Sequence, residues 1–241
     1  MEIDKSKVYY SVEGFPFKIV KMTSKLTCIV FAFKQGFMKG VRIDKINNVS
    51  FLINGKGYFD VTTIEEYCDK YNSKAYQIWT GILCRIGVSG YKDVSVCKEW
   101  LLFSRFEEFH TRWYQEGYAI DKDLLSGDTK IYSPYTCTYM PGYLNNSITP
   151  EFSKREYDFK KSNGIYYYDI ADIKQRIYSS TKDGIIHKYA ICRCIRVKTY
   201  YSSCWKFLRP EAREKIENMY QVEHLEKYIK EHLKEDNPPL N

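Results

Sequence analysis

The sequence predicts an α+β protein made of three successive modules, and three observations lead to this class. Short β-branched and aromatic runs, typical of strands, fill residues 1–60. From Thr63 onward, apolar residues recur at the three- and four-residue spacing of amphipathic helices. After residue 150, strand-like runs precede one long amphipathic stretch. We therefore predict a β-rich module at 1–60, a central module at 61–150, and a mixed α/β module at 151–241 that ends in a long helix.

The composition indicates a folded protein with reduced cysteines and no membrane segment. The chain has 241 residues, and its 23 Tyr and 13 Phe are far above ordinary usage. No stretch approaches the roughly 20 apolar residues of a membrane span, and the first residues lack the pattern of a signal peptide. The eight cysteines are scattered through a long chain, as free thiols usually are. These features predict a cytoplasmic protein without a membrane partner.

The β-rich module is predicted from runs separated by glycines and polar residues. The expected strands are 15–21, 26–33, 41–43 and 49–53. Nothing in these runs indicates chemistry, so we expect this module to serve in packing or docking.

In the central module the spacing predicts three helices and then a charged loop. The first helix begins after a cap at Thr62 or Thr63, and the others cover about 76–86 and 99–114. Residues 121–134 are rich in turn-forming and charged residues, and loops of this kind often carry functional sites.

The last module is expected to begin with a strand at 164–168 and a helix near 170–178. A second strand is predicted at 189–201, and a long helix, with proline in its first turn, at about 210–234. This last helix is acidic and has an apolar stripe. We expect it to pack on the body of the protein or on a second copy, which would make a homodimer.

The net charge is +7 with a pI of about 8.8, enough to attract a polyanion such as DNA. Between residues 182 and 209, seven Lys and Arg face a single acid. Tyrosines and Trp205 lie among these charges, so the segment could neutralise phosphates and stack on bases. Alternatively, its charges protect a strand edge from aggregation. Glycine motifs for nucleotide hydrolysis or dinucleotide binding do not occur.

Several short motifs follow one another between residues 76 and 146. In chain order they are Trp79 with Ile82-Leu83-Cys84-Arg85; Tyr91-Lys92-Asp93-Val94 with Val96-Cys97-Lys98-Glu99-Trp100; Phe103 and Phe106; Asp121-Lys122-Asp123; Ile131-Tyr132-Ser133-Pro134 with Cys137; and Pro141 with Asn145. In this order and spacing they resemble the HNH-type endonuclease module carried by phages. The resemblance implies a ββα-type central module, a phage origin, and action in the cytoplasm of the host cell.

In that family a histidine at the end of the first strand activates water beside a divalent metal. The Asp-His-Ile-Asp position of the family corresponds here to Asp121-Lys122-Asp123, and a mid-motif asparagine corresponds to Thr129. A lysine with its ordinary pKa of about 10.4 is a poor base between two aspartates. The motif is therefore degenerate where the general base should be.

The resemblance leaves several functions open. In an active nuclease, Asp121 and Asp123 would bind Mg²⁺, Lys122 would contact the scissile phosphate, and His110 would position water. In a module that only binds DNA, the same fold would be kept without cleavage. The candidate DNA contacts are Arg85, Lys130, Arg193, Arg196, Lys198 and Lys206. The third hypothesis is an inactive phage protein that binds and inhibits a host defence protein, and the fourth is that Asp-Lys-Asp is an ordinary surface turn.

Overall fold

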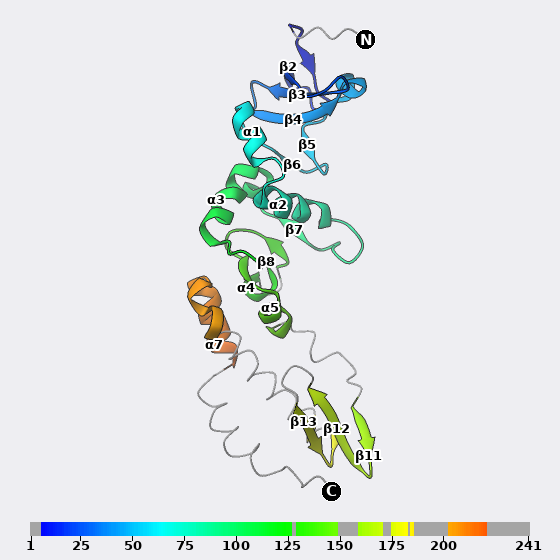
Figure 1. The fold of residues 1–241 in the computed structure, drawn as a ribbon, viewed down its shortest axis with the longest axis vertical. Coiled ribbons are helices and arrows are strands. Elements are labelled where there is room, and N and C mark those ends of the chain that lie inside the picture. Colours follow the sequence, from blue (N-terminus) through cyan, green and yellow to red (C-terminus); the bar gives the residue numbers. More distant parts are fainter. Residues whose placement is uncertain are drawn as a thin grey trace. The chain divides into compact units, whose positions relative to one another are not determined.

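The computed structural model has the predicted α+β fold, with a β-rich N-terminal sheet (Figure 1). It describes residues 6–126, 129–148, 159–170, 175–182, 184–185 and 202–220. The chain forms two compact units. The first unit contains residues 1–114 and 126–137, and the second contains 115–125 and 138–241. The module boundaries predicted after residues 60 and 150 stay predictions.

The first unit begins with an antiparallel sheet in the order β1-β2-β3-β4. Its strands are β1 (Tyr9–Tyr10), β2 (Pro16–Met22), β3 (Thr27–Ala32) and β4 (Phe37–Arg42). One face buries an apolar cluster that includes Phe17, Val30 and Phe51. The strands predicted at 15–21 and 26–33 are thus confirmed as β2 and β3.

The segment after β4 departs from the expected strands. It forms the 3-10 helix η1 (Ile43–Asn48) and then only the short strands β5 (Leu52–Ile53) and β6 (Gly57–Tyr58). The Lys39 ammonium donates to the carbonyl oxygens of Ser50 and Leu52, at 2.6 and 2.9 Å. A side chain therefore satisfies carbonyl groups that a longer strand would pair with a neighbour.

Three helices follow, as predicted. They are α1 (Ile64–Lys70), α2 (Lys74–Arg85) and α3 (Phe103–Trp113), and the 3-10 turn η2 (Glu99–Leu101) precedes α3. The Thr63 hydroxyl accepts a hydrogen bond from the Glu66 amide, which confirms Thr63 as the N-cap of α1. Asp60 caps α3 from outside, because its carboxylate accepts from the Ser104 amide at 2.9 Å.

Aromatic rings form the centre of this helical part. The Phe59 ring packs edge-on against Tyr76 and Phe103, with 4.9 Å between ring centroids in each pair. Trp79 is fully buried, and its indole N–H donates to the Trp100 carbonyl at 2.7 Å. The buried indole N–H of Trp79 therefore has a hydrogen-bond partner. Strands β7 (Ser95–Val96) and β9 (Ile131–Tyr132) pair in parallel at the end of the unit.

The second unit pairs β8 (Tyr118–Asp121) with β10 (Thr138–Pro141) in an antiparallel arrangement. The helices are α4 (Asp123–Ser126), α5 (Gly142–Ile148) and α7 (Pro210–Tyr220), with the 3-10 turn η5 (Trp205–Phe207) before α7. Leu124, Met140 and Leu144 pack with Leu208 and Ala212 in one buried cluster. The predicted final helix is confirmed from Pro210 to Tyr220, and its remainder lies outside the described residues.

A three-stranded antiparallel sheet, β11-β12-β13, also belongs to the second unit. Its strands are β11 (Lys160–Ser162), β12 (Ile165–Ile170) and β13 (Gln175–Ser179). The strand predicted at 164–168 is confirmed, but the helix predicted near 170–178 is wrong. Alternation there buries Ile177 against Tyr166 and Tyr168, so cross-strand packing overrides the helical spacing. The strand predicted at 189–201 lies outside the described residues.

Among the described helices, none is long and apolar enough to cross a membrane. The described cysteines are free thiols. They are Cys28, Cys68, Cys84, Cys97, Cys137 and Cys204.

Candidate functional site

The candidate site lies in the second unit, where β8 pairs with β10 and helix α5 follows β10. Asp121, the last residue of β8, pairs with Thr138, the first residue of β10. Helix α5 begins at Gly142, directly after β10, and contacts both strands. Two paired strands are thus followed by a helix after the second strand, and Asp121-Lys122-Asp123 lies where the chain leaves β8 for the short helix α4.

Asp121 is nearly buried, with 5% of its surface exposed. Its Oδ2 accepts a hydrogen bond from the Leu124 amide at 2.9 Å, so the carboxyl caps the first turn of α4. Burial raises the pKa of Asp121, and the nearby Asp123 charge adds to the rise while backbone hydrogen bonds oppose it. The environment therefore favours the neutral acid more than water does.

Lys122 is also buried, although its ammonium reaches a partner. The Nζ atom forms an ion pair with Oδ1 of Asp123, whose side chain is 56% exposed. The Lys122 side chain is therefore largely covered, and its charge is paired with a carboxylate that is itself exposed. Each side chain of the motif thus has a local contact: Asp121 accepts from α4 amides, and Lys122 forms an ion pair with Asp123.

These residues do not fit a divalent cation as they are placed. Magnesium requires near-octahedral oxygen coordination and is usually held by ionised carboxylates. Here the Asp121 carboxyl has a raised pKa and caps helix α4, and the Asp123 carboxylate is paired with the Lys122 ammonium. Within the described ranges, no group of three or more His, Cys, Asp or Glu is arranged to hold a metal ion. Binding of Mg²⁺ by Asp121 and Asp123 stays a prediction for experiment.

His110, the predicted water-positioning residue, lies on α3 in the first unit, whereas the acidic motif belongs to the second. Its ring is buried and stacks on Tyr114, with 4.4 Å between the ring centroids. Burial lowers the pKa of His110, and the positive charge of Lys74 lowers it further. A neutral imidazole packed among aromatic rings is the local role that this geometry supports.

Of the predicted DNA contacts, three lie in the described part of the chain. Arg85 is the last residue of α2 and is exposed. Lys130 precedes β9 with a φ of 45°, and its Nζ lies 3.6 Å from a carboxylate oxygen of Asp93. Lys206 is exposed on η5, with its Nζ 5.0 Å from the centre of the Phe207 ring. Arg193, Arg196 and Lys198 fall outside the described residues.

Two further positions of the family-like motif have local partners. The hydroxyl of Thr129, which corresponds to the mid-motif asparagine, donates to the Ser126 carbonyl at 2.8 Å. Asn145 lies half-buried on α5. Among the predicted catalytic and metal residues, the contacts therefore join Asp121, Lys122 and Asp123 and leave His110 in another unit.

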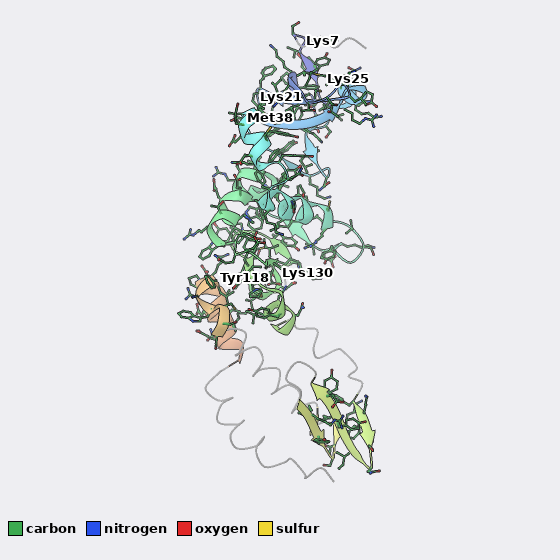
Figure 2. All side chains as sticks on the ribbon, in the orientation of Figure 1. Lys7, Lys21, Lys25, Met38, Tyr118 and Lys130 are labelled. Atoms are coloured by element: carbon green, nitrogen blue, oxygen red, sulfur yellow. The ribbon has the colours of Figure 1, made fainter. Side chains whose placement is uncertain are left out.

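A basic region that the sequence interpretation missed lies in the N-terminal sheet. Residues 16–42, which span β2 to β4, contain six Lys and Arg and no acid. The acids on either side are engaged: Glu13 accepts from the Ser50 hydroxyl and the Phe51 amide, and Asp44 pairs with Arg42 at 3.0 Å. Figure 2 labels three lysines of this module, Lys7, Lys21 and Lys25. A charge count along the first sixty residues would have revealed this region.

Comparison of the chain with protein-family models found no matching family, and comparisons with curated proteins and with solved structures found no match either.

Proposed function

We propose that this protein binds duplex DNA through a ββα module of the phage HNH-endonuclease type. The observation that carries the proposal is the antiparallel pair β8 and β10, with α5 directly after β10 and Asp121-Lys122-Asp123 at the end of β8. This order and position are those that the resemblance implies. A net charge of +7 supports the same reading, since DNA binding depends on neutralising phosphates. The setting that we propose is a phage protein acting in the cytoplasm of its host.

The contacts of the motif favour binding over cleavage. A hydrolytic HNH site needs a base near neutral pH and a metal that stabilises the charge on the phosphate. The chain has a lysine at the position of the base, and Asp123 is occupied by that lysine. We therefore propose retention of duplex DNA as the activity, and metal-dependent cutting as the outcome that would correct this choice.

The experiment uses a labelled duplex, incubated with the full-length protein with and without Mg²⁺ or Mn²⁺. We expect the wild type to retain the duplex at low salt and to leave it intact. The variant Asp123→Ala tests the cleavage reading without disturbing the helix cap, because Asp123 is largely exposed. Metal-dependent nicking by the wild type, lost in Asp123→Ala, would establish a nuclease. Absence of retention at low salt would reject the proposal.

The charge contacts are tested with Lys130→Ala/Lys206→Ala. The matched control is Lys160→Ala/Lys215→Ala, which removes the same charge from two other exposed positions. We expect weaker retention in the first variant and near wild-type retention in the control. Equal losses in both variants would indicate a nonspecific effect of net charge.

A second candidate is binding to a host protein, such as a component of a defence system. Three large aromatic side chains in the second unit favour it. Trp205 is 48% exposed, Phe207 40% and Tyr143 47%. Exposed aromatic residues of this kind are enriched in protein interfaces. If duplex DNA is not retained, comparing the host proteins that co-purify with wild type and with Trp205→Ala/Phe207→Ala would test this candidate.

A further inference from the structure

The β2 surface of the N-terminal sheet has features of a binding face that the proposed function does not use. We define this surface by Tyr10, Lys18, Val20 and Lys21, together with Lys25 and Leu26 in the adjoining turn. All six residues are exposed. They lie on strands β1 and β2 and in the β2–β3 turn of the first unit, apart in sequence from the ββα module.

A β-bulge creates the central part of this surface. Ile19 pairs with Val30 and Lys21 with Ile29, so Val20 is an extra residue in β2. A bulge of this kind interrupts the alternation of side chains. As a result both Val20 and Lys21 are exposed, on the face that Lys18 also occupies, while Met22 returns to the core side.

Tyr10 belongs to the same face by register. It pairs with Pro16, two residues before Lys18, whereas its neighbour Tyr9 pairs with Phe17 and stacks on that buried ring. Because side chains alternate along a strand, Tyr10 points away from the core with Lys18. Tyr10 as a whole is 66% exposed. Tyr10 and Lys18 are therefore diagonal neighbours on adjacent strands, with an exposed aromatic ring beside a lysine.

Within the part of the chain that the structure describes, only part of this sheet face is covered. Near β4, a Cβ added to Gly40 would lie 2.8 Å from the Tyr67 hydroxyl, so α1 packs closely there. Ile29 and Met38 are buried on the same face. On β2, Lys18 and Lys21 of this face are exposed, so the buried part of the face ends before these lysines.

The positive charge of the β2 surface indicates the kind of partner that it would bind. Lys18, Lys21 and Lys25 bring three exposed positive charges to the β2 surface, and residues 16–42 contain no acid, so this surface would attract a negatively charged partner. A basic surface that also carries an exposed aromatic ring suits a single nucleic-acid strand, since lysines neutralise phosphates and a ring stacks on an unpaired base. A membrane or an acidic protein would use the charge but would not need the stacking ring.

We propose that the β2 surface binds single-stranded nucleic acid, with Lys18, Lys21 and Lys25 contacting the backbone and Tyr10 stacking on a base. This inference goes beyond the proposed duplex binding, because it concerns another part of the chain and another form of nucleic acid. The two proposals can fail separately, since their variants and their probes differ.

The test measures the affinity of the full-length protein for a labelled oligothymidylate of about 16 nucleotides by fluorescence anisotropy. We expect Lys18→Ala/Lys21→Ala to weaken binding about tenfold at low salt. Tyr10→Ala should weaken it at least about fivefold, while Tyr10→Phe keeps the ring and should retain affinity. The control Lys160→Ala/Lys215→Ala, which loses the same charge, should bind like wild type, and thermal melting should show that all variants fold.

Dextran sulfate, a polyanion without bases, separates stacking from simple charge attraction. We expect Tyr10→Ala to leave the affinity for dextran sulfate unchanged. Failure of the wild type to bind the oligonucleotide at low salt would overturn the proposal. It would equally be overturned by Lys18→Ala/Lys21→Ala behaving like the control, or by Tyr10→Ala losing affinity for both probes to the same extent.

Discussion

Asp121 and His110 are ionisable residues that the fold buries, and burial shifts the pKa of each towards its neutral form. For Asp121 the pKa rises because the charged carboxylate loses hydration. For His110 the pKa falls for the same reason, with Lys74 adding to the effect. Lys122 keeps its stem covered and its ammonium paired with Asp123. At the scale of single residues, the motif that resembles a catalytic site is thus stabilised by local contacts.

Asp121 gives a prediction at this scale. Its raised folded-state pKa means that the carboxyl favours folding when protonated, below the ordinary pKa of about 3.9, and that this contribution is lost as pH rises through the folded-state pKa. Asp121→Asn keeps a cap acceptor without the buried charge. We expect this variant to have a higher free energy of unfolding than wild type at neutral pH, with the difference vanishing in acid. Urea denaturation at several pH values measures this.

The matched variant Asp121→Ala removes the cap as well, so it should lower the free energy of unfolding by about 1 kcal/mol relative to Asp121→Asn. If Asp121 were a metal ligand, Mg²⁺ would stabilise the wild type against urea and leave Asp121→Asn unaffected. That result would contradict the capping role of Asp121.

At the scale of elements, close packing between strands and helices holds the first unit together. Gly57 on β6 is buried, and a Cβ added there would lie 2.7 Å from Trp79, 2.8 Å from Leu83 and 2.9 Å from the Leu101 carbonyl oxygen. Strand β6, helix α2 and the turn η2 meet at this glycine. The missing side chain is therefore what lets a strand approach the indole ring of Trp79.

We predict that Gly57→Ala destabilises the first unit by about 1–3 kcal/mol, because the new methyl group overlaps both side-chain and backbone atoms. The measurement is the free energy of unfolding from urea titration followed by tryptophan fluorescence, since Trp79 lies at the contact. Gly55→Ala is not a suitable control, because Gly55 has a φ of 70° that alanine rarely adopts. Gly81→Ala, on α2 with no atom within 4 Å of the added Cβ, should be neutral or stabilising.

At the scale of the whole molecule, the positive charge is unevenly distributed. The overall charge is +7, yet residues 16–42 carry six bases without an acid and residues 182–209 carry seven bases with one. The rest of the chain is therefore net negative. Binding of a nucleic acid to either region should depend on ionic strength, because exposed charges are screened by salt.

We predict that the logarithm of the duplex affinity falls linearly with the logarithm of salt concentration. Each lysine that contacts a phosphate should account for about one unit of this slope. Lys130→Ala/Lys206→Ala should thus flatten the slope by up to about two units, and Lys160→Ala/Lys215→Ala should leave it unchanged. A salt-independent affinity would argue against phosphate contacts by these lysines.

The sequence alone determined the class of the fold, because hydrophobic periodicity and turn residues are local signals. They located β2, β3 and the three helices of the first unit, and the start of α7 at Pro210. The order of the motifs also predicted Asp121-Lys122-Asp123 as the candidate site. The positive charge of the N-terminal sheet is equally a property of the sequence, since residues 16–42 contain six bases and no acid.

Only the tertiary structure decided which contacts these residues make. Burial of Asp121, its cap on α4 and the separation of His110 into another unit depend on pairings between distant segments. The same holds for β13, where Ile177 packs against tyrosines of β12, and for Gly57, whose neighbours come from other elements. Hydrophobic periodicity indicates which side of a helix or strand is apolar. Long-range contacts decide against which other element that side packs.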